Sequence, residues 1–77
     1  MDYSKEKVDD MVLALLHLTM FSDTDGNRRS WKNHDWDVMD RLHEKGYIGN
    51  PKSKARSVSV TDDGKNRAEE MFRQYCQ

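Results

Sequence analysis

The fold is decided by residues 40–64, which read DRLHEKGYIGNPKSKARSVSVTDDG. Gly46 follows a charged segment that contains a leucine, at the place where a left-handed glycine commonly ends a helix. The residues at 49–52 are a strong turn signal between two extended stretches. Val58 and Val60 alternate with polar residues, which is typical of a strand with one buried face. This stretch therefore predicts the end of a helix followed by a β-hairpin.

Helices are predicted on both sides of the hairpin. Downstream, Thr61 suits the N-cap of a last helix, whose buried face would hold Ala68, Met71, Phe72 and Tyr75. Upstream, Asp35 suits the N-cap of a helix that reaches Lys45. The core face of that helix would hold Trp36, Val38, Met39, Leu42 and His43.

The first third of the chain predicts a long helix and a loop. Ser4 suits an N-cap, and we expect a helix over residues 4–20. Its apolar residues recur at three- and four-residue steps, at Val8, Met11, Val12, Leu13, Leu15, Leu16 and Leu18. Residues 21–27 predict a turn rather than a calcium loop. Residues 28–32 predict one helical turn around Trp31, ended by a left-handed Asn33.

The predicted order is helix, short helix, helix, β-hairpin, helix, within one domain over residues 1–77. This is an α+β, mainly helical, winged helix-turn-helix-like architecture. Residues 40–48 and 57–64 resemble the back half of MarR-like and PadR-like winged-helix regulators. That resemblance implies binding to duplex DNA through a hairpin wing.

The whole chain also resembles a small bacterial family of uncharacterised domains. The resemblance is carried by LALLHLT at 13–19, WK at 31–32, DWDVM at 35–39, DRLH at 40–43 and NPKSKA at 50–55. It extends over nearly the full length and implies no particular activity.

Composition favours a binding role over a catalytic one. A single cysteine, Cys76, fits a reducing compartment, and the N-terminus lacks the pattern of a signal peptide, so we expect a cytoplasmic protein. The longest apolar-rich run, residues 11–16, is far too short to span a bilayer. The spacing of the histidines and carboxylates matches no metal, cofactor or catalytic motif. We therefore expect no enzyme activity, no metal and no cofactor.

The charge is distributed unevenly along a chain whose net charge is −1. Residues 28–56 hold eight lysines and arginines against four carboxylates, a net charge of +4. Such cations typically bind phosphates and position a protein on nucleic acid. The candidate nucleic-acid-binding residues are Arg28, Arg29, Lys32, Arg41, Lys45, Lys52, Lys54 and Arg56.

Two features keep a second hypothesis open, a module for protein interaction or dimerisation without DNA binding. The helix that would enter the major groove carries Asp35, Asp37, Asp40 and Glu44, which phosphates repel. The terminal helices also hold more apolar surface than a short chain easily buries, and a homodimer would use Met20, Met71 and Tyr75. Trp31 and Trp36 are expected to be core anchors, with stacking on bases or on a partner as the alternative.

Overall fold

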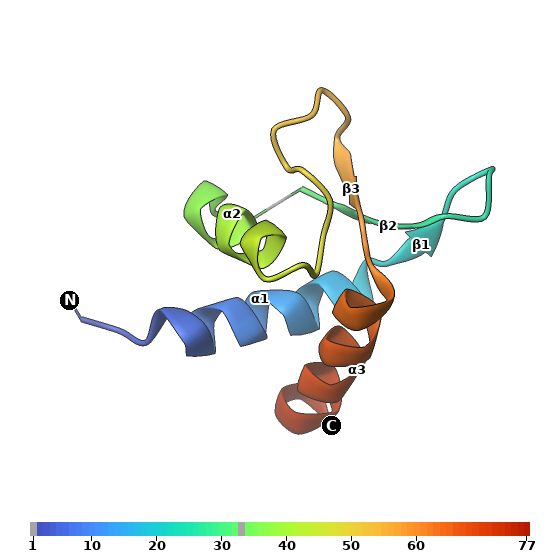
Figure 1. Cartoon of the computed structure of the whole chain (residues 1–77). Coiled ribbons are helices and arrows are strands. Elements are labelled where there is room, and N and C mark those ends of the chain that lie inside the picture. The colour runs from blue at the N-terminus through green and yellow to red at the C-terminus, as the bar shows by residue number, and fades with distance from the viewer. Residues whose placement is uncertain (1, 33) are drawn as a thin grey trace.

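A computed structural model describes residues 2–32 and 34–77 of the chain. The described residues form three helices and a three-stranded antiparallel sheet of order β1-β2-β3, as Figure 1 shows. In chain order the elements are α1 (Lys5–Leu18), β1 (Phe21–Ser22), β2 (Arg28–Trp31), α2 (Trp36–Glu44), β3 (Ser57–Ser59) and α3 (Asp62–Cys76). The α+β class predicted from the sequence is confirmed. No helix in the described part of the chain is both long and apolar enough to cross a membrane.

The helix caps lie where their residue types predicted them. The hydroxyl of Ser4 accepts a hydrogen bond from Lys7 N, so α1 begins at the expected place and ends two residues earlier than predicted, at Leu18. The carboxylate of Asp35 accepts from the backbone of the first turn of α2. Gly46 follows α2 with a φ of 79°, in the left-handed region that only glycine enters readily. Thr61 Oγ1 accepts from Gly64 N at the start of α3.

Residues 21–31 form a β-hairpin, so the helical turn predicted at residues 28–32 is wrong. The turn is closed by Asp23, whose Oδ1 accepts from Asp25 N and Asn27 N at 2.9 Å. Strand β2 pairs with β1 on one edge and with β3 on the other, where Ser30 lies opposite Val58. This long-range pairing overrides the weak local preference for a turn. The left-handed conformation expected at Asn33 lies outside the described residues.

The short helix expected before α2 is absent from the described residues, because residues 28–31 form strand β2. In the part of the chain that the structure describes, no helix directly precedes α2, and hence α2 has no partner for a helix-turn-helix. The predicted hairpin at residues 47–60 does form, through an antiparallel bridge between Ile48 and Val60 and a hydrogen bond of 2.9 Å from Gly49 N to Ser59 O. Its strand is shorter than the period-two pattern suggested, and residues 49–56 form a loop between α2 and β3.

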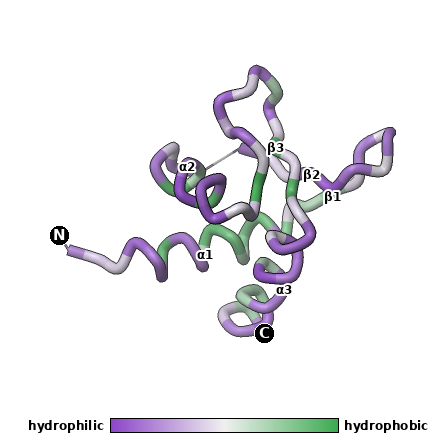
Figure 2. The backbone as a smooth tube through the Cα atoms, in the orientation of Figure 1, coloured by the Kyte–Doolittle hydropathy of each residue, from purple (hydrophilic) through white to green (hydrophobic). Residues whose placement is uncertain are grey.

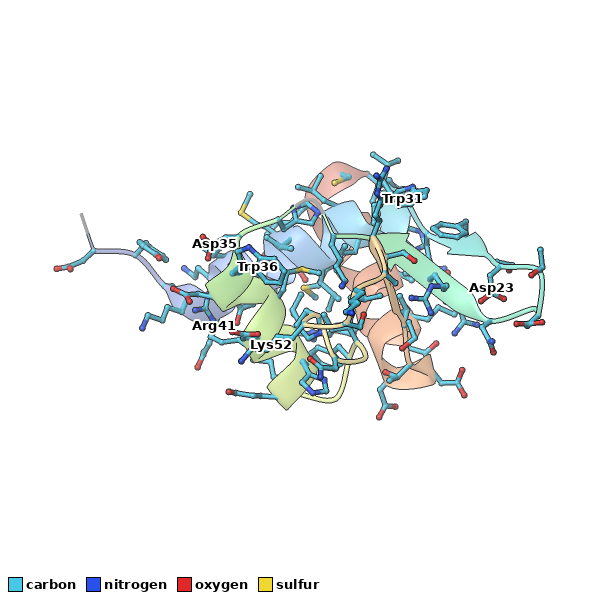
Figure 3. All side chains as sticks on the ribbon, turned by 90° about the horizontal axis from the view of Figure 1, so that it is seen from above. Asp23, Trp31, Asp35, Trp36, Arg41 and Lys52 are labelled. Atoms are coloured by element: carbon cyan, nitrogen blue, oxygen red, sulfur yellow. The ribbon has the colours of Figure 1, made fainter. Side chains whose placement is uncertain are left out.

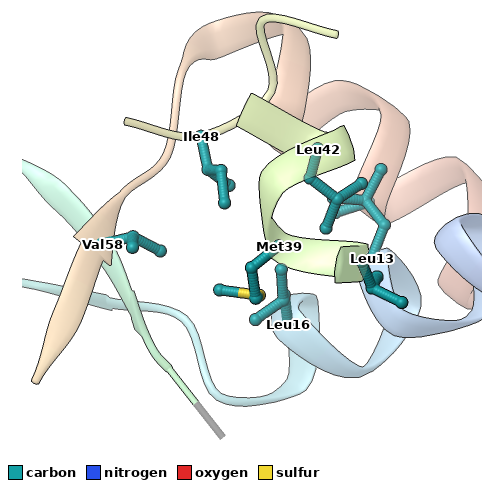
Figure 4. Packing of buried hydrophobic residues seen from close by; sticks show 8 residues of the cluster. Leu13, Leu16, Met39, Leu42, Ile48 and Val58 are labelled. Carbon is teal, nitrogen blue, oxygen red and sulfur yellow. The ribbon is translucent and has the colours of Figure 1, made fainter. Parts of the chain in front are cut away.

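One core joins the helices to the inner face of the sheet. Figure 4 shows leucines of α1 meeting α2, Ile48 and Val58. The buried cluster consists of Leu13, Leu16, Val38, Met39, Leu42, Ile48, Val58 and Ala68. Val58 and Val60 are both buried, as the period-two pattern predicted.

Several apolar side chains predicted to be buried are exposed instead. On α1 these are Met11, Leu15 and Leu18. The helix packs on the core through the face that holds Leu13 and Leu16, and its apolar residues extend around the helix beyond that face. On α3, Ala68 and Met71 are buried and Phe72 is half-buried. Tyr75 is exposed because the C-terminal end of α3 extends away from the sheet (Figure 1).

The prediction that the two tryptophans anchor the core is also wrong. Trp31 is 45% exposed and Trp36 is 60% exposed. On α2 the buried side chains are Val38, Met39 and Leu42, and Trp36 is displaced from Leu42 by about 120° around a helix of 3.6 residues per turn. Trp31 alternates along β2 with Ser30, which is fully buried and points inward.

Candidate functional site

Two of the predicted phosphate-binding cations, Arg41 and Lys45, form ion pairs with a buried carboxylate. Asp9, on α1, has no exposed surface. Arg41 Nη2 donates to its Oδ1 at 2.8 Å and Arg41 Nε to its Oδ2 at 2.9 Å. Lys45 Nζ lies 2.9 Å from the same Oδ2. Arg41 and Lys45 therefore fasten α2 to α1 and are not free to hold a phosphate.

The charge on Asp9 is stabilised in the folded protein. Burial by itself raises the pKa of this carboxyl group, but hydrogen bonds from Arg41 and Lys45 lower it by more, and the net pKa lies below its ordinary value. Asp9 is not among the functional residues predicted from the sequence. The signal that would have revealed it is spacing, because Asp9 precedes the buried Leu13 and Leu16 by four and seven residues on one helix face.

The two arginines of β2 are engaged in the sheet and its surroundings. Arg29 Nε donates to Ser57 Oγ at 2.7 Å, and its Nη2 donates to Ser57 O at 2.8 Å, across the pair of β2 with β3. Arg28 Nη1 lies 3.3 Å from Asp62 Oδ1 at the start of α3. These contacts give both side chains a structural partner.

Three of the remaining predicted cations line one hollow. It has a volume of about 600 Å³ and lies between the end of β2, the start of α2 and the loop before β3. We call it the tryptophan groove, and its lining residues are Trp31, Lys32, Trp36, Ser53, Lys54, Ala55 and Arg56. Trp31 extends from the sheet and Trp36 from the first turn of α2 (Figure 3). Within the described residues, neither Lys54 nor Arg56 has a carboxylate within ion-pair distance.

Hydrogen bonds from Lys32 hold the loop before β3, which forms one side of the tryptophan groove. Lys32 Nζ donates to Ser53 O at 2.7 Å and lies 3.2 Å from Ser53 Oγ, and Lys32 N donates to Arg56 O at 3.0 Å. The ring of Trp31 packs against Phe21, with centroids 5.0 Å apart. These contacts within the protein position the loop and the ring of Trp31 without a ligand.

Lys52 belongs to a different surface. It lines a smaller hollow of about 290 Å³ with Asp40, His43, Glu44 and Asn50, beside α2. In Figure 3 Lys52 lies next to α2, and Asp23 lies at the far tip of the β1–β2 hairpin. The three predicted cations of residues 52–56 are thus divided between two surfaces, with Lys54 and Arg56 in the tryptophan groove and Lys52 beside α2.

The outer side of α2 is acidic. Asp37 and Glu44 are exposed and Asp40 is half-buried, and Figure 2 shows α2 as largely hydrophilic. Among residues 2–32 and 34–77, no three His, Cys, Asp or Glu side chains gather closely enough to hold a metal ion. The groove instead combines exposed indole rings with unpaired cations, which suits a ligand that is both anionic and planar.

Comparison with known proteins places the chain in a family. It belongs to the family described as "Domain of unknown function (DUF6429)", whose model matches residues 4–77. It is similar to the uncharacterized protein y4hR of Sinorhizobium fredii, with 47% identity over 73 residues that cover 95% of this chain and 93% of that relative. The full-length resemblance to a small bacterial family is therefore confirmed. No solved structure matches the chain significantly, and the winged-helix resemblance gains no support from these comparisons.

Proposed function

We propose that this domain binds nucleic acid through the tryptophan groove, as a binding or regulatory module and not as an enzyme. The observation that carries the proposal is the meeting of Trp31 and Trp36 with Lys54 and Arg56 around one hollow. Bases stack on aromatic rings, and lysine and arginine neutralise phosphates, so the two residue types together match the two parts of a nucleotide.

The exposure of the tryptophans supports this proposal over a purely structural role. Leaving a large aromatic ring in water forfeits the stabilisation that its burial would give a small domain. Both tryptophans of the chain line this groove. Their fluorescence therefore reports on the proposed site without any label.

The test is a titration of the protein with oligonucleotides at low salt, followed by tryptophan fluorescence. We expect saturable quenching that the double variant Lys54→Ala/Arg56→Ala loses. The matched control is Lys5→Ala/Lys7→Ala, which removes the same charge from exposed positions near the start of α1. No binding by the unaltered protein, or equal weakening by both double variants, would overturn the proposal.

A second candidate function is self-association through α1, which a separate observation favours. Met11, Leu15 and Leu18 are 54%, 46% and 66% exposed and follow each other at four- and three-residue steps along one helix. An apolar stripe of this kind commonly packs against another helix. The interface predicted from the sequence needs correction, since Met71 is buried in the core and Met20 is half-buried against it, whereas Tyr75 is exposed.

A further inference from the structure

We infer that the nucleic acid recognised by this domain is single-stranded, with unpaired bases stacking on Trp31 and Trp36 and the adjoining phosphates held by Lys54 and Arg56. The inference rests on the proposed function and deepens it by naming the form of the ligand. Three features of the structure carry it: the exposed indoles, the small number of free cations and the acidic surface of α2.

Exposed indole rings favour an open strand. In a duplex each base is stacked between its neighbours, and its face is unavailable to a protein side chain. A single strand offers the face of every base, and stacking on an aromatic side chain strengthens binding by about 5- to 150-fold per base. The ring of Trp31 packs against Phe21 and Trp36 is the first residue of α2, so the sheet and the helix place both residues at the edge of the groove.

The cations of the groove form a short patch. Lys54 and Arg56 are exposed and two residues apart. Lys32 has little capacity left for a phosphate, because an ammonium group has three N–H donors and two contacts of Lys32 go to Ser53 O and Ser53 Oγ. Such a patch suits two or three consecutive phosphates of one strand better than the two phosphate rows that border a groove of a duplex.

The surface that a duplex would meet is unfavourable. Helix α2 is the helix predicted to enter the major groove of a duplex. It presents Asp37, Asp40 and Glu44. Its two cations, Arg41 and Lys45, are bound to Asp9. Phosphates flanking a major groove would therefore face carboxylates without compensation.

The experiment compares a fluorescently labelled 15-nucleotide oligothymidylate with a 15-base-pair duplex, using anisotropy at low salt with the full chain. We expect the single strand to bind at least tenfold more tightly than the duplex. Trp36→Ala should weaken single-strand binding by about 5- to 150-fold, should leave duplex binding almost unchanged, and should be rescued by Trp36→Phe. A parallel titration with oligouridylate distinguishes RNA from DNA as the source of the strand.

The controls separate the two proposals. Tyr3→Ala removes an exposed aromatic ring outside the groove and should not change the affinity. Circular dichroism should show that Trp36→Ala remains folded, since the ring contributes little to the core. Equal affinity for both ligands, or a tryptophan variant without effect, would overturn the single-strand inference and leave nucleic-acid binding standing. Absence of binding to either ligand at low salt would overturn the proposed function itself.

Discussion

Arg41 donates two hydrogen bonds to the carboxylate of Asp9, from Nη2 at 2.8 Å and from Nε at 2.9 Å. This pair links the middle of α2 to the buried side of α1. The two residues are 32 positions apart in the chain. The carboxylate of Asp9 is the fully buried partner, whereas the guanidinium of Arg41 reaches solvent. The pair is therefore a structural link in which Arg41 compensates the buried negative charge of Asp9.

The first prediction concerns the contribution of this link to stability. Asp9→Asn should lower the free energy of unfolding at neutral pH by about 1–3 kcal/mol, because it removes charge-assisted hydrogen bonds while both cations can still reach water. Urea unfolding of the two proteins measures the difference. Arg41→Ala should cost more than Asp9→Asn, since it leaves a buried carboxylate with Lys45 alone.

The same pair predicts how stability depends on pH. The pKa of Asp9 is lower in the folded protein than in the unfolded chain. Its contribution is therefore complete above the ordinary aspartate pKa of about 3.9 and is lost as the pH falls through the lower folded value. The difference in unfolding free energy between the unaltered protein and Asp9→Asn should shrink when measured in acid. A difference that stays constant with pH would mean that the ionised carboxylate is not its source.

The hydrophobic core makes a further prediction. Leu42 is fully buried and belongs to the central cluster, so Leu42→Ala should cost about 2–5 kcal/mol through lost burial and a residual cavity. Leu18→Ala is the matched control at a protein concentration low enough to keep the chain monomeric, because the same truncation at an exposed position should then cost less than about 0.5 kcal/mol. Similar losses at both positions in a denaturant melt would show that α2 does not bury this face.

Another prediction concerns Gly64, which lies in the first turn of α3 and is buried. A Cβ atom at this position would overlap the carbonyl oxygen of Tyr47. Replacing a helical glycine by alanine ordinarily stabilises a protein by about 1 kcal/mol, but here we expect Gly64→Ala to destabilise it. Asn66→Ala, on an exposed position of the same helix, should be neutral or slightly stabilising. A stabilised Gly64→Ala protein would contradict the close approach of α3 to Tyr47.

Features that depend on neighbouring residues could be predicted from the sequence, and features that depend on distant residues could not. The caps at Ser4, Asp35 and Thr61 form within three residues of each side chain, so their residue types were sufficient. Strand β2 exists because Ser30 pairs with Val58, 28 positions later, and no local pattern encodes that pairing.

The candidate site follows the same rule. Residue type identified the cations, but which of them are free depends on partners elsewhere in the chain, such as Asp9 for Arg41. The tryptophans were expected in the core because most such residues in small domains are buried. Trp36 is exposed because Val38, Met39 and Leu42 define the buried face of α2 and Trp36 lies outside it.

A separate prediction tests self-association. If the exposed stripe of α1 mediates dimerisation, the protein should sediment as a dimer at high micromolar concentration, and Leu15→Gln/Leu18→Gln should sediment as a monomer. Both side chains are exposed in the single chain, so the variant should keep its fold by circular dichroism. A monomer at the same concentration without substitution would remove this candidate function.

The last prediction uses salt to count phosphate contacts in the tryptophan groove, and the loop before β3 supplies its own control. Each contact with a single strand lowers the logarithm of affinity by about 0.7 per logarithmic unit of salt. Lys54→Ala should therefore flatten the slope for oligothymidylate by about 0.7, and Lys54→Ala/Arg56→Ala by about 1.4. Lys52 lies in the same loop but lines the acidic hollow beside Asp40 and Glu44. Lys52→Ala should leave the slope almost unchanged although it removes the same charge. Equal flattening by Lys52→Ala and Lys54→Ala would mean that the strand senses the overall charge of the loop and does not occupy the groove.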